Sequence, residues 1–228
     1  DDVEDITSIC GGLNINIGTL NKNTIPSMFL AGKKANALGH IVLLDPVGAG
    51  ASRLRTDTAN RLMQEVRFDA VRGNISEIKT LCTGSGSTKG VDADAVDAVT
   101  EANLDDGVQL VKAFAQKTGC IVAVTGAIDL VSDGERCWCI RNGRAEMSRI
   151  TGTGCQLSAL MTAFLVANPD RKLDAAAAAV CMMGLAGEIG WANMQPGDGN
   201  STYRNRIIDA IFNMTGDALE EGAKYELR

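Results

Sequence analysis

Short strand-like runs and longer helical stretches alternate along most of this chain. Residues 13–17 alternate apolar and amide side chains, as a half-buried strand does. Three later runs also have the composition of strands, at residues 41–44, 70–72 and 121–124. Because each run is followed by a stretch of helical spacing, the pattern predicts an α/β fold. A mostly parallel central sheet with helices on both faces is the simplest architecture that fits it.

Residues that favour helix ends mark the predicted helices. Pro26 lies in the first turn of one helix, and Gly39 follows its last residue. Thr56 can cap the next helix, and Asn74 can open a third. Later helices are predicted at residues 105–117, 155–167, 173–192 and 206–223.

Two hairpin signals interrupt this alternation after residue 128. Asp133-Gly134 and Asn142-Gly143 are dipeptides that favour tight hairpin turns. They separate three strand-like segments, at residues 129–132, 136–141 and 144–147. The sequence therefore predicts a small antiparallel flap beside the parallel sheet. Residues 84–90, rich in Gly and Ser, are predicted to form a surface loop.

Composition limits the domain count and the partners. The 228 residues are 45% hydrophobic and contain no repeat or linker, so residues 1–228 are predicted to form a single domain. The net charge of −6 without a run of Lys or Arg argues against nucleic acid or an anionic membrane as partner. The apolar stretches at residues 157–167 and 174–180 look too short or too interrupted to span a bilayer. No signal-peptide pattern opens the chain, and we expect a cytoplasmic protein.

The cysteines and the single histidine exclude several kinds of site. Seven scattered cysteines, an odd number, do not suggest a disulfide framework, and no CxxC pair suggests structural zinc. The sole histidine, His40, lies between Gly39 and a predicted strand, where a role in the turn is favoured. A histidine triad is therefore not expected, and acid–base chemistry falls to a carboxylate or a thiol.

A glycine-rich turn leads directly into an apolar helix at residues 151–155. Gly152 and Gly154 allow a ligand to approach the backbone closely, and Cys155 follows them in the first helical turn. The first N–H groups of a helix are unpaired donors at the positive end of its dipole, which suits a phosphate. The alternative is an ordinary helix start capped by Thr151 or Thr153.

Three predicted strand ends carry polar residues that would meet this turn at one edge of the sheet. Arg72 could hold a nucleotide phosphate, while Asp45 and Glu77 could arrange water around magnesium. Thr125 ends the fourth strand. Structural roles remain open for the charged residues: a capping box for Glu77, a turn before Pro46 for Asp45, and a surface ion pair for Arg72.

These segments together resemble the hydroxyethylthiazole kinase family, from the first residues to the last and in order. The segments that carry the resemblance are Asn14-Ile15-Asn16-Ile17-Gly18-Thr19-Leu20, Leu44-Asp45-Pro46-Val47-Gly48-Ala49-Gly50-Ala51, Val71-Arg72-Gly73-Asn74 with Glu77, Val124-Thr125-Gly126, Asp129 with Asp133-Gly134, and Gly152-Thr153-Gly154-Cys155. The resemblance implies a ribokinase-like fold and a homotrimer with sites between subunits. It also implies phosphorylation of 4-methyl-5-(2-hydroxyethyl)thiazole by ATP with Mg²⁺, in thiamine biosynthesis and salvage.

The same resemblance implies roles for the nucleotide and metal region. Arg72 and Thr125 would contact ATP, and Asp45 and Glu77 would serve the magnesium and phosphate region. Phosphoryl transfer has a loose transition state with charge on the transferred oxygens, so positioning and electrostatic stabilisation dominate catalysis.

Further roles implied by the resemblance concern the substrate alcohol. Gly18 and Thr19 would line the thiazole pocket, and Gly152 would contact the thiazole. Gly154 would belong to an anion hole, and Cys155 would lie nearest the substrate hydroxyl. Related sugar kinases carry Asp at the position of Cys155. The thiol could accept the proton or only orient the hydroxyl, and a small buried apolar residue is the structural alternative.

One departure and three alternatives accompany this interpretation. Family members begin with a segment that closes over the thiazole, whereas this sequence starts at Asp1. We therefore expect thiazole binding to be weaker than nucleotide binding in residues 1–228 alone. A dinucleotide-binding oxidoreductase would need a GxGxxG turn, which residues 45–50 do not form. A nucleotide-binding sensor without turnover and a kinase of another small alcohol stay open.

Overall fold

The computed structural model describes residues 1–84 and 98–228, and it contains a seven-stranded sheet whose strands lie in chain order. The first four strands run parallel, and the last three are paired antiparallel. The strands are β1 (Gly12–Asn16), β2 (Ile41–Asp45), β3 (Ala70–Asn74), β4 (Ile121–Thr125), β5 (Asp129–Ser132), β6 (Cys137–Ile140) and β7 (Tyr225–Leu227). The predicted α/β class is confirmed, with a mixed sheet that is parallel in its first half.

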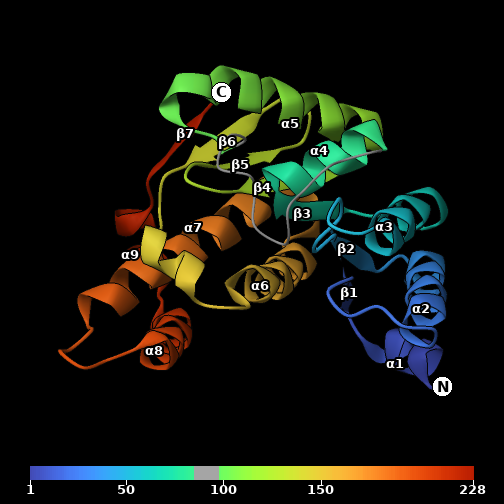
Figure 1. Ribbon diagram of the computed structural model, residues 1–228, viewed down its shortest axis with the longest axis horizontal. Helices are drawn as coiled ribbons and strands as arrows, with labels where there is room; N and C mark the ends of the chain where they lie inside the picture. Colours follow the sequence, from blue (N-terminus) through green and yellow to red (C-terminus); the bar gives the residue numbers. More distant parts are fainter. Residues whose placement is uncertain (85–97) are drawn as a thin grey trace.

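Helices cover both faces of this sheet (Figure 1). One face carries α2 (Thr24–Leu38), α3 (Arg53–Glu65), α4 (Ile75–Thr83) and α5 (Leu104–Thr118), with α1 (Val3–Ile9) packed on α2. The other face carries α6 (Thr153–Ala167), α7 (Lys172–Ala192) and α8 (Asn200–Asn213), followed by the short α9 (Gly216–Gly222). Three short 3₁₀ helices complete the described elements: η1 (Glu101–Asn103), η2 (Ala145–Arg149) and η3 (Pro169–Arg171).

Each face of the sheet has its own hydrophobic core, because successive side chains of a strand point to opposite faces. In β2, Val42 and Leu44 join the core beneath α2 to α5, whereas Ile41 and Leu43 join the core beneath α6 to α8. All five residues of β2 are buried. Burial on both faces explains why residues 41–44 of this strand are all apolar and do not alternate, before the strand ends at Asp45.

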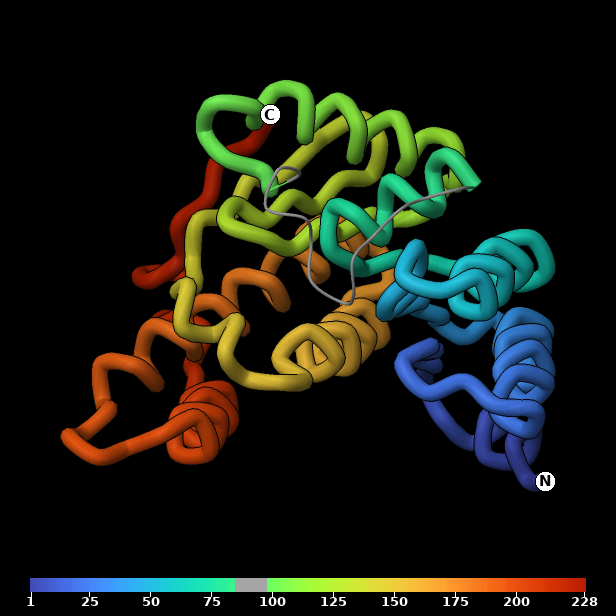
Figure 2. The backbone as a smooth tube through the Cα atoms, viewed as in Figure 1, coloured from blue at the N-terminus to red at the C-terminus, as the bar shows by residue number. Residues whose placement is uncertain are grey.

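The predicted antiparallel flap is wrong in its third strand. Residues 145–149 form the 3₁₀ helix η2, and the partner of β6 is β7, near the end of the chain. The physical reason lies in Asn142, which makes no hairpin turn. Its Nδ2 donates to the carbonyl of Gly222 at 2.9 Å, and its Oδ1 accepts the N–H of Lys224 at 2.7 Å. Asn142 thereby anchors the C-terminal segment alongside β6, where Figure 2 shows the last residues in red.

Two predicted helix boundaries also differ from the structure. Ser52, not Thr56, caps α3: its Oγ accepts the N–H of Arg55 at 3.3 Å. The single helix predicted at residues 206–223 is two helices, α8 and α9, and Thr215 caps the second. The loop predicted at residues 84–90 lies outside the described residues from 85 onward.

Helix α7 matches the predicted bounds of 173–192 to within one residue, but its apolar stretch is longer than residues 174–180, which the sequence analysis judged too short to span a bilayer. The segment Pro169–Ala192 has the length and composition of a membrane-crossing helix. However, 67% of its apolar 18-residue stretch is buried inside the protein. It packs between the sheet and α6, α8 and α9. Burial against protein on most sides accounts for its apolar surface, so the helix is a core element here.

Small residues let α7 approach its neighbours closely. A Cβ at Gly184 would lie 2.7 Å from the backbone carbon of Asn142 and 2.8 Å from its carbonyl oxygen. Backbone atoms cannot swing aside as a side-chain tip can. The glycine therefore sets the distance between α7 and the segment that anchors β7.

We expect Gly184→Ala to lower the free energy of unfolding by about 1 to 3 kcal/mol, the usual cost of overpacking. Thermal and urea unfolding followed by circular dichroism would measure it. Gly216→Ala is the matched control, since a Cβ there meets no described atom within 4 Å. Equal stability of the two variants would contradict this view of the α7 contact.

Candidate active site

Four polar residues end the four parallel strands at one edge of the sheet. Asn16, Asp45, Asn74 and Thr125 are the last residues of β1 to β4, and the register pairs Asn16 with Asp45 and Asn74 with Thr125. The first turn of α6 reaches the same edge, because Cys155 contacts Asn16. The meeting of strand ends and glycine-rich turn expected from the sequence is confirmed.

Asp45 is the buried centre of this edge. Its Oδ2 accepts hydrogen bonds from Asn16 Nδ2 at 2.9 Å and from Ser158 Oγ at 2.8 Å. Burial raises the pKa of the Asp45 carboxyl, and the Arg72 charge and the two hydrogen bonds oppose that shift. Its Oδ1 is buried and has no hydrogen-bond partner among the described residues. A buried carboxylate oxygen without a partner is an atom to which a ligand can bind.

Arg72 extends from β3 across the strand ends. Its Nη2 donates to Thr125 Oγ1 at 2.5 Å, and its Nη1 lies 3.9 Å from Asp45 Oδ2. The side chain is only 12% exposed, so the ion pair with Asp45 lies inside the protein and the surface ion pair considered from the sequence is wrong. Within the described part of the chain, Arg72 Nε has no acceptor. The guanidinium keeps an N–H group for an anion.

The first turn of α6 has no side-chain cap among the described residues. Gly152 occupies the N-cap position with φ of 96°, a left-handed conformation that favours glycine. The hydroxyl of Thr153 donates back to the carbonyl of Ile150, so neither threonine caps the helix as the sequence alternative supposed. A Cβ at Gly154 would lie 2.6 Å from Nη1 of Arg72, which places the guanidinium directly over the turn. Helix amides and arginine therefore meet here.

Cys155 is exposed at this turn, whereas the other six cysteines are buried or half-buried. Its Sγ accepts a hydrogen bond from Asn16 Nδ2 at 3.1 Å. The alternative of a small buried apolar residue is therefore wrong for Cys155. The thiol is available to a molecule from solution.

Glu77 is buried beside the loop that follows β2. Its Oε1 accepts the N–H of Gly48 at 2.7 Å, and its Oε2 accepts the N–H of Asn74 at 2.8 Å. Asn74 and Glu77 form the capping box of α4 that the sequence analysis considered. Burial raises the pKa of the Glu77 carboxyl, and the two backbone N–H groups oppose the shift. The carboxylate braces two strand-end loops at once.

Gly18 and Thr19 follow β1 at the rim. The Gly18 N–H donates to Asn16 Oδ1 at 2.8 Å, and its carbonyl accepts from Arg55 Nη2 at 2.9 Å. Arg55 also donates to the carbonyl of Val47 at 3.0 Å and so joins the loops after β1 and β2. Thr19 is exposed beside this junction.

Three residues that organise the site were not assigned to it from the sequence: Asn16, Ser158 and Arg55. Asn16 ends a strand within the motif that carried the family resemblance, and Ser158 stands one helical turn after Gly154. The positions of Asn16 and Ser158 relative to these motifs are evident in the sequence. Their function is not, because it depends on contacts with Asp45 and Cys155 that only the folded chain makes.

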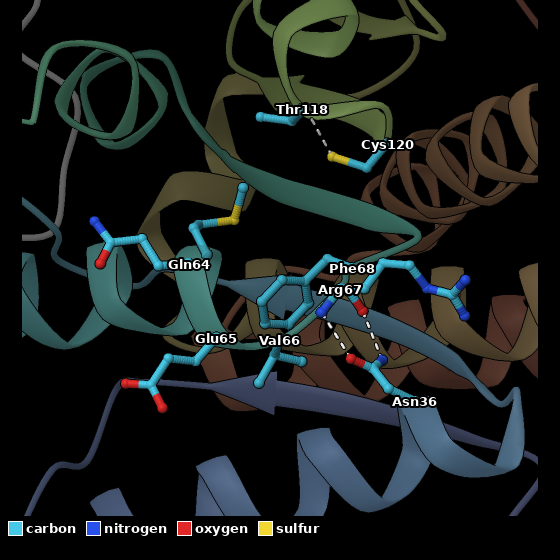
Figure 3. Close-up of a pocket in the computed structure, with 9 residues that line it drawn as sticks. Asn36, Gln64, Glu65, Val66, Arg67, Phe68, Thr118 and Cys120 are labelled. Atoms are coloured by element: carbon cyan, nitrogen blue, oxygen red, sulfur yellow. Dashed lines mark hydrogen bonds between the residues drawn. The ribbon is translucent and has the colours of Figure 1, made fainter.

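An open cavity of about 400 Å³ lies elsewhere, at the start of β3 and β4. Figure 3 shows it next to the Asn36 amide, which binds both the backbone N–H and the carbonyl of Arg67. Since this cavity lies at the opposite ends of the strands, it is separate from the site just described. In the described residues no three His, Cys, Asp or Glu side chains cluster as a metal site.

Known proteins share both this sequence and this fold. The model of the hydroxyethylthiazole kinase family (HK) matches residues 1–217. A hydroxyethylthiazole kinase of Clostridium acetobutylicum is 55% identical over 225 residues, covering 99% of this chain and 82% of the relative. One of Ruminiclostridium cellulolyticum is 45% identical over 224 residues, covering 98% and 80%.

Solved structures agree with the sequence comparison. The structure of a hydroxyethylthiazole kinase from Pyrococcus horikoshii superposes with a TM-score of 0.85 at 29% identity, covering 100% of this chain and 81% of the other. A pyridoxal kinase of Staphylococcus aureus in complex with ADP has a TM-score of 0.62 at 18% identity, covering 99% and 76%, and shares the fold alone. The fold is thus ribokinase-like, and with its sequence matched over residues 1–217 the chain belongs to the hydroxyethylthiazole kinase family.

Proposed function

We propose that this chain transfers the γ-phosphoryl group of ATP to the hydroxyl of 4-methyl-5-(2-hydroxyethyl)thiazole, giving the thiazole phosphate and ADP in thiamine biosynthesis and salvage. The observation that carries the proposal is the meeting of Arg72, Asp45, Cys155 and the uncapped first turn of α6 at one edge of the sheet. Family membership supports the reaction and the substrate. A non-catalytic sensor is less consistent with an exposed thiol at the anion-binding turn.

Arg72, Thr125 and the turn at Gly154 form the phosphate-binding part of the site. The N–H groups at the start of α6 and the Arg72 guanidinium lie on the same side of the strand ends. Both are oriented donors, and Arg72 is mostly buried, which strengthens its interaction with charge on the transferred phosphoryl oxygens. Thr125 holds Nη2 of Arg72, so the arginine is positioned before ATP arrives.

Asp45 and Glu77 fit a hydrated magnesium ion. Asp45 Oδ1 is a buried carboxylate oxygen without a described partner, and each Glu77 oxygen has one backbone donor and capacity for another. Carboxylates and retained water are the ligands that Mg²⁺ prefers. Bound with ATP, Mg²⁺ would neutralise phosphate charge, while the two carboxylates orient its water molecules.

Cys155 serves the substrate alcohol. Its exposed sulfur lies at the turn that holds the transferred phosphoryl group, so it orients the hydroxyl toward phosphorus and accepts its proton as the new O–P bond forms. The bond from the γ-phosphorus to the bridging oxygen breaks, and ADP leaves with that oxygen.

Gly18, Thr19 and Gly152 are assigned to the thiazole pocket. Gly152 supports this role because a Cβ there would meet no described atom within 4 Å, which leaves room for a ring. We assign the active form to a homotrimer with sites between subunits, located in the cytoplasm. Exposed apolar side chains on α1 and α2, among them Ile9 and Leu30, offer a surface for a neighbouring subunit.

Cys155→Ala is expected to lower kcat by about 10²- to 10⁴-fold while the Kd for ATP stays nearly constant, because one acid–base group typically contributes that factor. Cys155→Asp should retain activity. Coupled ADP-release assays and calorimetric ATP titration would measure both quantities. Cys10→Ala, at a half-buried cysteine beyond α1, is the control. A Cys155→Ala enzyme as fast as the parent would remove the thiol from the mechanism.

Arg72→Ala is expected to weaken ATP binding by about 1.5 to 3 kcal/mol, as loss of charge-assisted hydrogen bonds does. Gly154→Ala should act in the same direction, since the added Cβ displaces the guanidinium. Calorimetry with ATP gives both values. Arg53→Ala removes an exposed arginine of α3 and should leave the affinity unchanged. Unaltered ATP binding in both site variants would contradict the phosphate assignment.

Asp129 closes the turn that follows Thr125 and predicts a pH effect on stability. Its Oδ1 accepts the Gly126 N–H at 2.8 Å, and burial raises its pKa from 3.8 to about 7, against the opposing effects of that N–H and the Arg72 charge. Between these two values the native carboxyl holds a proton that the unfolded chain has lost. Stability therefore falls as pH rises through this window.

Asp129→Asn should remove that part of the pH dependence. Urea unfolding at pH 5, 6, 7 and 8 would show a smaller loss of stability with rising pH than in the parent. Asp209→Asn, at an exposed aspartate of α8, should follow the parent curve. Parallel curves for the parent and Asp129→Asn would show that Asp129 ionises alike in both states.

A further inference from the structure

The Asn16 carboxamide joins three parts of the site. Its Nδ2 donates to Asp45 Oδ2 at 2.9 Å and to Cys155 Sγ at 3.1 Å, and its Oδ1 accepts the Gly18 N–H at 2.8 Å. These contacts connect the end of β1 to the end of β2, to the first turn of α6, and to the loop assigned to the thiazole. Both N–H groups and the oxygen of this half-buried side chain are engaged.

The orientation of this carboxamide is determined by its neighbours. A backbone N–H can only donate, so the atom facing Gly18 must be the oxygen. The NH₂ group then necessarily faces Asp45, whose Oδ2 also accepts the Ser158 hydroxyl. A flipped amide would place its oxygen against the Asp45 carboxylate and its NH₂ against the Gly18 N–H, and both contacts would be repulsive.

This orientation determines what the Cys155 sulfur does. An amide N–H has no acceptor capacity, so the sulfur accepts and any proton that it carries points away from Asn16. The same hydrogen bond holds the sulfur in one position at the exposed turn. The sulfur is exposed, so a substrate hydroxyl can still reach it.

We propose that Asn16 is a positioning residue that holds the Cys155 sulfur as a hydrogen-bond acceptor and aligns it with Asp45 and the Gly18 loop. The catalytic consequence rests on the proposed function of Cys155. The contact itself does not, since it can be measured without ATP or substrate. Asn16 acts through Cys155 and touches no reacting atom of the substrate.

The reactivity of the Cys155 thiol with iodoacetamide tests this proposal directly. In the whole protein at pH 7.5 the alkylation rate of each cysteine would be measured by peptide mass spectrometry. We expect Asn16→Ala and Asn16→Ser to slow alkylation of Cys155 by about 3- to 10-fold, the effect of losing one net hydrogen bond. Both variants remove the N–H toward sulfur without adding a second carboxylate beside Asp45.

Asn14→Ala is the matched control on the same strand. Asn14 lies two residues before Asn16, and its Oδ1 has no hydrogen-bond partner among the described residues. Cys155 of the Asn14→Ala variant should be alkylated at the same rate as Cys155 of the parent. Circular dichroism would verify the fold of each variant, and if Asn16→Ala unfolds, Asn16→Ser still tests the proposal because it keeps a neutral polar side chain beside Asp45.

Steady-state kinetics separate this proposal from the proposed function. Asn16→Ser should lower kcat with less than about a twofold change in KM for ATP, because it adds no charge beside Asp45 and leaves Arg72 and the α6 amides in place. Slower alkylation of Cys155 in the Asn16 variants supports the proposal. If Cys155→Ala also keeps full activity, only the proposed catalytic role of the thiol fails, and the role of Asn16 in holding the sulfur stands. Alkylation of Cys155 at the parental rate in both Asn16 variants would overturn it.

Discussion

The buried carboxylate of Asp45 is the constraint on which the rest of the site depends. A buried charge lowers the stability of a fold unless it is paired with an opposite charge and hydrogen-bonded. Here the partners come from three other elements: Asn16 from β1, Arg72 from β3 and Ser158 from α6. The sheet and α6 must therefore assemble in one arrangement to satisfy this single group. That arrangement also brings Cys155 and the first helical amides to the strand ends, so stability and function share their contacts.

The parallel half of the fold could be predicted because local sequence specifies it. The buried residues 41–44 of β2 are continuously apolar, and glycines such as Gly39 and Gly119 adopt the left-handed conformation that ends a helix. The C-terminal half is less local. Residues 225–227 pair with β6 across more than eighty residues of chain, and no property of Asn142-Gly143 distinguishes a hairpin from the anchor that it makes. Long-range pairing overrode a sound local signal.

The candidate site also has a part that the sequence predicts and a part that depends on long-range contacts. Arg72, Thr125, Gly154, Asp45 and Cys155 were identified from residue types, their order and the family resemblance, and the structure brings them together. Glu77 shows the limit of such reasoning, since its capping box and its position near Asp45 are compatible and no choice between them was needed. Asn16 and Ser158 could not be assigned because an amide and a hydroxyl are common side chains. Only their shared contact with Asp45 gives them a role.

The hydrogen bond between Asn16 and Cys155 spans 139 positions of the chain. A ribosome-bound chain synthesised as far as β6 already contains β1 to β4, yet it lacks α6 and hence Ser158, Cys155 and the helix amides. In such a chain the Asp45 carboxylate lacks the hydrogen bond from Ser158, and water can reach the side that α6 covers in the complete protein. The edge formed by the ends of β1 to β4 and the first turn of α6 is therefore completed only after α6 has been synthesised.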